Sequence, residues 1–121
     1  MERTIYLAGP MTGIPQFNHP AFMAAATLLR AEGHTVFNPV ENDMKKYGEE
    51  FIVKNKKGDA EKAAKAGFSL RKALKDDLVW ICENADTIAL LPGWEKSAGA
   101  RVEWALAIAL DMDIFYIGDL V

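Results

Sequence analysis

The sequence has little of several residue types, and each scarcity excludes a class of protein. It contains one cysteine, Cys82, and two histidines, which excludes an internal disulfide framework and leaves too few ligands for a zinc site. Its longest apolar runs are too short to span a membrane. The first ten residues lack the apolar core of a signal peptide, so we expect a cytoplasmic protein.

Basic residues are not in excess either. The chain has 14 Lys and Arg against 17 Asp and Glu, which gives a net charge of −3. A nucleic-acid partner is therefore not expected, because nucleic-acid binders carry a basic surface. With 121 residues, half of them apolar, the chain is long enough for one hydrophobic core and too short for two. We expect a single domain over residues 1–121.

Strand and helix patterns alternate along the chain. Short apolar runs over 4–8, 34–38, 86–91 and 114–117 predict four strands. Helical spacing predicts helices between Asn18 and Gly33, from Ser69 to about 84, and over 98–111. Residues 41–68 are rich in charged residues, glycine and alanine, and predict a variable surface insert or lid. The alternation predicts an α/β fold with a small parallel sheet, in a flavodoxin- or Rossmann-like three-layer sandwich.

Ligands of such sheets bind beyond the carboxyl ends of the strands, which selects the loops after Ala8, Asn38 and Leu91. Two of these loops are candidates for an anion site. The loop after the first predicted strand contains Gly9 and Gly13, which let backbone N–H groups approach an anion. Ser97 precedes the last predicted helix and would place a hydroxyl at its positive end. An ordinary turn and an ordinary helix N-cap explain the same residues.

Two carboxyl groups and a tyrosine are candidates for catalysis. Glu103 lies in the first turns of an apolar helix that we expect to be buried, and a buried carboxylate needs a reason. Asp77 interrupts the apolar helix face of positions 70, 73 and 81, although a salt bridge to Arg101 would also explain it. The Tyr6 hydroxyl could orient Glu103. Two nearby carboxyls suit glycosidic chemistry, in which one attacks the anomeric carbon and the other handles the proton of the leaving group.

Three segments in this order resemble the nucleoside 2-deoxyribosyltransferase superfamily: TIYLAGP at 4–10, DDL at 76–78 and SAGARVEWA at 97–105. The similarity is closest to short members, which include an often phage-borne family and the 2′-deoxynucleoside 5′-monophosphate N-glycosidases. It covers the chain apart from 41–68. The resemblance implies a deoxyribosyltransferase-like fold, a nucleotide or nucleoside ligand, no metal or other cofactor, and a homodimer or higher homo-oligomer.

The resemblance also implies roles for individual residues. Glu103 corresponds to the nucleophile that attacks C1′ of deoxyribose, and Tyr6 to the tyrosine beside that nucleophile. Asp77 corresponds to the aspartate that acts on the base or activates water. Ser97, six residues before Glu103, corresponds to a serine that holds the 5′-phosphate in the N-glycosidases, whereas the transferases tend to carry an acidic residue there.

The remaining phosphate contacts follow from the same comparison. Pro10 stands where the N-glycosidases have a phosphate-binding serine, and Thr12 is the expected substitute. We therefore expect the phosphate to be held by Ser97 and Thr12 together with backbone groups at Gly9, Gly13 and Gly99.

The expected function is hydrolysis of the N-glycosidic bond of a 2′-deoxynucleoside 5′-monophosphate through a glutamate nucleophile, which releases free base and deoxyribose 5-phosphate. Three alternatives stay open. The protein could be a nucleoside 2-deoxyribosyltransferase that exchanges bases, a non-catalytic nucleotide-binding module, or an enzyme that cleaves a ribosyl substrate such as a nicotinamide dinucleotide. The identity of the base does not follow from the sequence.

Overall fold

The computed structural model describes residues 2–48, 57–65, 67 and 69–118. Its strands are β1 (Thr4–Ala8), β2 (Thr35–Phe37), β3 (Thr87–Leu90) and β4 (Asp113–Tyr116). Its helices are α1 (His19–Ala31), α2 (Pro39–Tyr47), α4 (Ala60–Lys65), α5 (Leu70–Asn84) and α6 (Ala98–Ala109), with short 3-10 turns η1 (Pro15–Asn18) and η2 (Trp94–Lys96). All four predicted strands are confirmed, with bounds that differ by at most one residue at each end.

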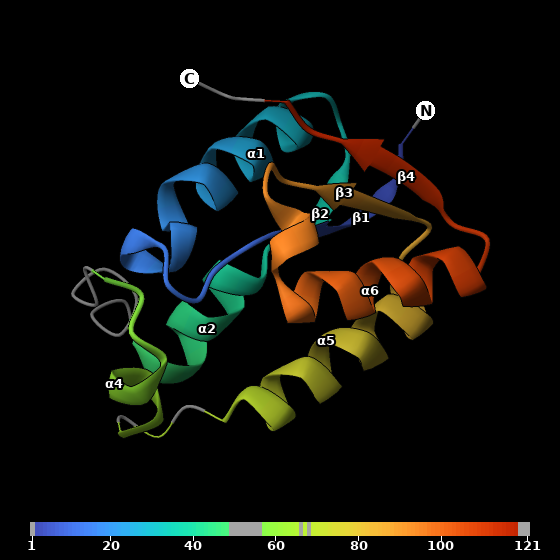
Figure 1. The fold of residues 1–121 in the computed structure, drawn as a ribbon. Coiled ribbons are helices and arrows are strands. Elements are labelled where there is room, and N and C mark those ends of the chain that lie inside the picture. Colours follow the sequence, from blue (N-terminus) through green and yellow to red (C-terminus); the bar gives the residue numbers. More distant parts are fainter. Residues whose placement is uncertain (1, 49–56, 66, 68, 119–121) are drawn as a thin grey trace.

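The four strands form one parallel sheet in the order β2-β1-β3-β4. Helix α1 covers one face of this sheet, and α5 and α6 cover the other (Figure 1). The side chains of β1 alternate between the two layers, as a pleated strand requires. Ile5 and Leu7 pack in the core on the α1 side, whereas Tyr6 and Ala8 pack with residues of α5 and α6. The three-layer α/β fold predicted from the sequence is therefore confirmed.

The segment 41–68 is not all surface. Asn38 caps α2 by accepting a hydrogen bond from the N–H of Val40 at 3.0 Å, and Pro39 occupies the first turn. Val40 is fully buried, and Asp43 is only 7% exposed. Within residues 41–48 only Asp43 is buried, so the prediction of a surface segment is wrong at that residue, because the cap and the proline start a helix that packs its side chain inward. Residues 49–56, 66 and 68 of the predicted insert or lid lie outside the described residues.

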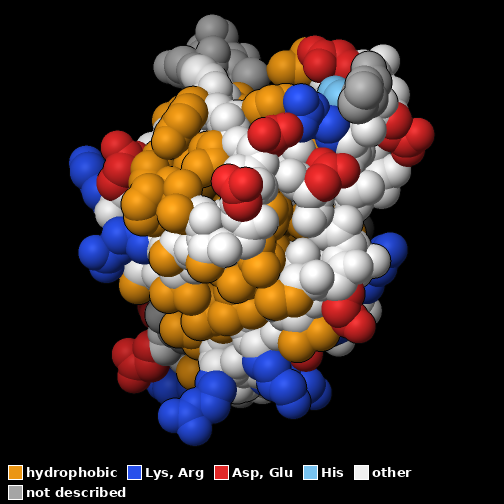
Figure 2. Space-filling model, turned by 90° about the vertical axis from the view of Figure 1, so that its right-hand side faces the viewer, with side chains coloured by type: hydrophobic (Ala, Val, Ile, Leu, Met, Phe, Trp, Pro, Cys, Tyr) orange, Lys and Arg blue, Asp and Glu red, His pale blue; other side chains and the backbone are white. Residues whose placement is uncertain are grey.

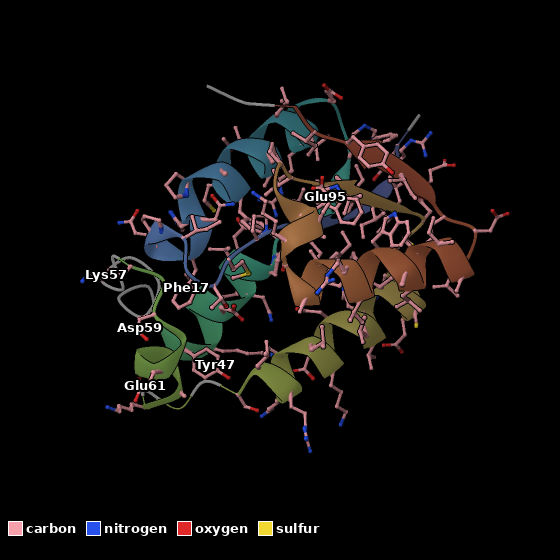
Figure 3. The ribbon with its side chains drawn as sticks, viewed as in Figure 1. Phe17, Tyr47, Lys57, Asp59, Glu61 and Glu95 are labelled. Carbon is pink, nitrogen blue, oxygen red and sulfur yellow. The ribbon has the colours of Figure 1, made fainter. Side chains whose placement is uncertain are left out.

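A later part of this segment returns to the loop after β1. The N–H of Gly13 donates to the carbonyl of Gly58 at 2.8 Å. A Cβ atom on Gly58 would lie 2.1 Å from the carbonyl oxygen of Ile14, and its φ of +63° also favours glycine. Lys57 and Asp59 lie at the same end of the molecule as Phe17 of η1 (Figure 3). This turn is thus fixed against the loop that borders β1.

Helix α6 is only partly buried, although its apolar composition predicts a buried helix. Glu103 and Ala107 face the core, as predicted for Glu103. Val102 and Ile108, on the outer face, are 43% and 50% exposed. The prediction is wrong for that face, because α5 and α6 together form an outer layer of the sandwich (Figure 1), and the side of α6 that carries Val102 and Ile108 stays exposed. Among the described helices, none is long and apolar enough to cross a membrane.

Candidate active site

A cleft of about 740 Å³ opens at the carboxyl edge of the sheet, which is where ligands of parallel α/β sheets bind. Its walls come from the loop after β1, the first half of α2, the first half of α5, and the segment that leads into α6. The volume suits a small-molecule ligand. The structure brings all the predicted site residues to this cleft: Tyr6, Gly9, Thr12, Gly13, Asp77, Ser97, Gly99 and Glu103.

Tyr6 and Glu103 form the buried centre of the cleft. The Tyr6 hydroxyl donates a hydrogen bond to Oε2 of Glu103 at 2.6 Å. This contact follows from the strand pleat, since Tyr6 faces the helix layer in which Glu103 lies one turn into α6. Burial raises the pKa of Glu103 to about 8, although the bond from Tyr6 acts in the opposite direction. Burial and the neighbouring carboxylates raise the pKa of Tyr6 well above its ordinary value, so Tyr6 remains a donor.

Asp77 reaches the same centre from α5. Burial raises its pKa to about 6, while hydrogen bonding with Tyr6 and the charge of Lys46 lower it. The adjacent Asp76 points outward and forms an ion pair with Lys46 at 2.7 Å. In the part of the chain that the structure describes, no ion pair joins Asp77 to Arg101. The explanation of Asp77 by that salt bridge is therefore wrong.

The raised pKa values of Glu103 and Asp77 belong to an interacting pair, because the charge of Asp77 acts on Glu103. Two such groups titrate together, and between about pH 6 and pH 8 the pair holds one proton. One protonated and one ionised carboxyl are what acid-assisted cleavage of a glycosidic bond requires. The pKa values of about 8 and about 6 leave this proton on Glu103 in the free protein, so the site supplies an ionised Glu103 and a protonated Asp77 once the proton has moved from one carboxyl to the other.

A third carboxyl of the cleft, Asp43, was missed by the sequence reasoning. It enters from α2, and burial together with the charge of Asp77 raises its pKa to about 7. A signal was present, because Val40, Asp43, Met44 and Tyr47 follow helical spacing. Asp43 interrupts this apolar stripe just as Asp77 interrupts its own. The signal was hidden because the segment was interpreted as a surface insert.

The opposite end of the cleft is suited to an anion. Ser97 is the N-cap of α6, as predicted, and its Oγ accepts a hydrogen bond from the N–H of Ala100 at 3.2 Å. Its hydroxyl hydrogen remains able to donate to a ligand. Nothing lies within 4 Å of the Cβ position of Gly99, so a ligand can approach the backbone of the first turn, where the helix end is positive. Lys96, which was not predicted, adds a cation to this wall.

Gly9 allows the loops after β1 and β3 to approach each other. A Cβ atom on Gly9 would lie 2.8 Å from the Cβ of Leu91, closer than side chains tolerate. Thr12 and Gly13, further along the same loop, are exposed at the rim of the cleft. Gly9 therefore has a steric reason of its own, and the loop that contains it lines the same cleft as Ser97.

Comparison with known proteins matches residues 3–116 to the model of a family described as a domain of unknown function, DUF4406. The match includes all four strands and every residue predicted for the site. No curated protein and no solved structure matches the chain.

Proposed function

The chain belongs to the family of the domain of unknown function DUF4406, and from its site we propose that it hydrolyses the N-glycosidic bond of a 2′-deoxynucleoside 5′-monophosphate. One observation carries the proposal: the buried hydrogen bond from Tyr6 to Glu103 lies in a cleft that also holds Asp77. An oriented carboxylate beside a second carboxyl is what a double displacement at a sugar carbon needs. The resemblance to the deoxyribosyltransferase superfamily supports the same reaction.

The first half-reaction releases the base. A proton first passes from Glu103 to Asp77, because Glu103 has the higher pKa of the two and carries the proton in the free protein. An oxygen of the ionised Glu103 then attacks C1′ of the deoxyribose while the C1′–N bond breaks. The electron pair of that bond goes to the base nitrogen, and the protonated Asp77 supplies a proton to the base. Tyr6 holds Oε2 of Glu103 and leaves the other carboxylate oxygen for the sugar. The products are the free base and an ester between Glu103 and C1′.

The second half-reaction releases the sugar. Asp77, now ionised, accepts a proton from water, whose oxygen forms a bond to C1′ as the ester bond to Glu103 breaks. The product is 2-deoxyribose 5-phosphate. Glu103 is again a carboxylate and Asp77 is again protonated, so the pair is ready for another turnover.

The 5′-phosphate binds at the N-terminus of α6 in this proposal. The Ser97 hydroxyl and the backbone N–H of Gly99 donate to its oxygens, and Lys96 adds positive charge. Thr12 and the backbone of Gly9 complete the phosphate site from the other side. The expected contact from the N–H of Gly13 is not available, because this group donates to the carbonyl of Gly58. Because nucleoside monophosphates are cytoplasmic metabolites, the proposal also places the protein in the cytoplasm.

A panel of deoxynucleoside 5′-monophosphates and the matching nucleosides, resolved by chromatography, tests the function. We expect free base and deoxyribose 5-phosphate from at least one monophosphate, and less product from the nucleoside. Formation of a new nucleoside when a second free base is added would instead identify a transferase. Binding without base release at high enzyme concentration would identify a non-catalytic nucleotide-binding module. Either result contradicts hydrolysis.

Ser97→Ala should raise KM for the monophosphate by about tenfold or more, because a hydrogen bond to a charged group is lost. KM for the nucleoside should stay unchanged, and steady-state kinetics on both substrates measures the difference. The variant also removes a helix cap, which costs about 1 kcal/mol of stability. Ser69→Ala is the matched control, since Ser69 caps α5 in the same way and does not line the cleft. Equal effects on both substrates would refute phosphate binding by Ser97.

We also propose that the protein forms a homodimer, or a higher homo-oligomer, through the outer face of α5 and α6. Val79, Val102 and Ile108 are exposed on these helices. A groove between the helices has mostly apolar walls, which include Leu78 and Leu106. Figure 2, which views the side of the molecule shown at the right of Figure 1, shows hydrophobic side chains gathered across the middle of that side and most Lys and Arg at its margins. Exposed apolar patches of this kind mark interaction sites.

Val102→Glu should convert the oligomer to a monomer, because an unpaired charge buried in an interface is strongly unfavourable. Sedimentation velocity over a range of protein concentrations measures the change. Leu28→Glu is the control, since Leu28 on α1 is 47% exposed and lies on the other side of the sheet. It should leave the oligomeric state unchanged. A wild-type protein that sediments as a monomer at every concentration would contradict the proposal.

A further inference from the structure

No step of the proposed reaction uses Asp43. This residue lines the cleft, and only 7% of its surface is exposed. Among the described residues, nothing donates a hydrogen bond to it and no ion pair includes it. Lys46 acts on Asp43 through its charge, but its ammonium group is paired with Asp76. The Asp43 oxygens stay accessible from the cleft, since among the described residues only Trp104 Nε1 is a fully buried side-chain polar atom without a partner. A largely desolvated carboxyl without a protein donor is nevertheless unfavourable for folding. Such a group is expected where a ligand supplies the missing donor.

Asp43 lies towards the end of the cleft that is opposite Ser97 and the proposed phosphate site. It follows β2, whereas Ser97 follows β3, and β1 lies between these two strands. The charge of Asp77 acts on both Asp43 and Glu103, but Asp43 is not among the charges that act on Glu103. In the part of the chain that the structure describes, no three acidic, His or Cys side chains converge as a metal site would require. The three carboxyls are therefore spread along the cleft, with Asp77 in the middle.

A bound nucleotide would extend along the cleft in the same direction, from Ser97 towards Asp43. With its phosphate at Ser97 and its C1′ at Glu103, the base extends past Asp77 towards Asp43. The cleft wall also includes apolar side chains of the β1 loop and η1, among them Met11, Ile14 and Phe17. These can cover the faces of a base, while Asp43 is the polar group available to its edge.

We propose, building on the proposed function, that Asp43 accepts a hydrogen bond from an exocyclic amino group of the leaving base and so selects amino-bearing bases over their carbonyl counterparts. A carboxyl keeps an acceptor oxygen whether or not it is protonated, but only the ionised form rejects a carbonyl, because the O–H of a protonated Asp43 would donate to it. A carbonyl at the same position of the base cannot donate to the carboxylate. Its lone pairs would face those of the carboxylate oxygens, which is repulsive. Sites built to bind an N–H group discriminate strongly against an analogue that lacks it.

Two matched substrate pairs test this inference: the 5′-monophosphates of deoxycytidine and deoxyuridine, and those of deoxyadenosine and deoxyinosine. Within each pair, an amino group replaces a carbonyl. At pH 8, above the pKa of about 7 of Asp43, we expect the wild type to prefer the amino member by at least about tenfold in Kd and in kcat/KM. Asp43→Leu should reduce this preference to less than about twofold, because the leucine offers no acceptor.

Two further variants separate base recognition from a structural effect. Asp43→Asn offers a donor beside its acceptor, so it should improve the carbonyl member of each pair relative to the wild type. Asp76→Asn is the control, since Asp76 shares Lys46 with Asp43 and does not line the cleft. It should leave the base preference unchanged. An equal loss on all four nucleotides in Asp43→Leu would indicate a structural role and would overturn the inference.

Binding is measured by calorimetry beside turnover, so that this inference and the proposed function can fail separately. A wild type that releases base without discriminating either pair overturns the role of Asp43 and leaves hydrolysis standing. The same conclusion follows if a preference exists and Asp43→Leu retains it. A wild type that releases no base, but binds the amino members more tightly through Asp43, supports the inference and overturns hydrolysis. A protein that binds none of the four nucleotides overturns both.

Discussion

Glu103→Gln is expected to lower kcat/KM for base release by about 10³-fold or more, the scale seen when a catalytic nucleophile is removed. The amide of glutamine cannot form the ester with C1′ that the proposed reaction requires. Chromatographic detection of free base, with the substrate that the wild type uses best, measures the loss. Nucleotide binding should persist, because the phosphate seat and Asp43 remain.

The same substitution should leave the fold intact. Glutamine has nearly the size of glutamate, and its carbonyl can still accept the hydrogen bond from Tyr6. The Tm should therefore equal or exceed that of the wild type, since a buried acid has been replaced by a neutral group. Glu95→Gln is the matched control, because Glu95 is exposed on η2 and does not line the cleft. Turnover that survives Glu103→Gln would remove Glu103 from the reaction.

The free energy of unfolding is expected to fall as the pH rises from about 5 to about 8. Burial raises the pKa values of Asp77, Asp43 and Glu103 to about 6, 7 and 8, whereas all three lie near 4 in an unfolded chain. The folded protein therefore keeps protons that the unfolded chain has lost, and stability decreases with pH. This stabilisation is fully present below about pH 4 and is lost as the pH passes each folded pKa. Each carboxyl contributes on the order of 1 kcal/mol or more.

Urea unfolding at a series of pH values measures this dependence. Asp43→Asn and Glu103→Gln should each flatten the decrease, because each removes one group with a raised pKa. Asp76→Asn should not, since the ion pair with Lys46 lowers the pKa of Asp76 and its titration ends below this pH interval. Stability that increases between pH 5 and pH 8 would contradict the burial of three carboxyls in this cleft.

The burial of these carboxyls is unfavourable for folding, and this is itself informative about function. Tyr6 is fully buried beside Glu103, Asp77 lies next to both, and Asp43 has no donor of its own among the described residues. A core selected for stability alone would place apolar side chains at these positions. Sites that break the ordinary rules of folding in one place are typical of binding and catalysis.

Local chemistry was sufficient to predict the elements of the fold from the sequence. Ser69 and Ser97 predicted the starts of two helices because a cap acts through atoms only two or three residues away. The apolar run 4–8 predicted a buried strand, and alternating strand and helix patterns predicted the parallel sheet. The burial of Glu103 also followed from its immediate neighbours. Each of these inferences depends on interactions within a few turns of chain.

Only the tertiary structure decided which side chains meet. Tyr6 and Glu103 are 97 residues apart in sequence, and their hydrogen bond depends on the pleat of β1 and on α6 covering that face of the sheet. Asp43 joins the cleft because the strand order β2-β1-β3-β4 places α2 beside it, and the outer face of α6 is exposed because no further layer is described over it. Local propensity extends over a few residues, whereas strand order and layer packing are set by the burial of the whole chain. For that reason the helical spacing of the sequence could mark Asp43 as a polar residue in an apolar stripe, but only the strand order places it in the same cleft as Asp77 and Glu103.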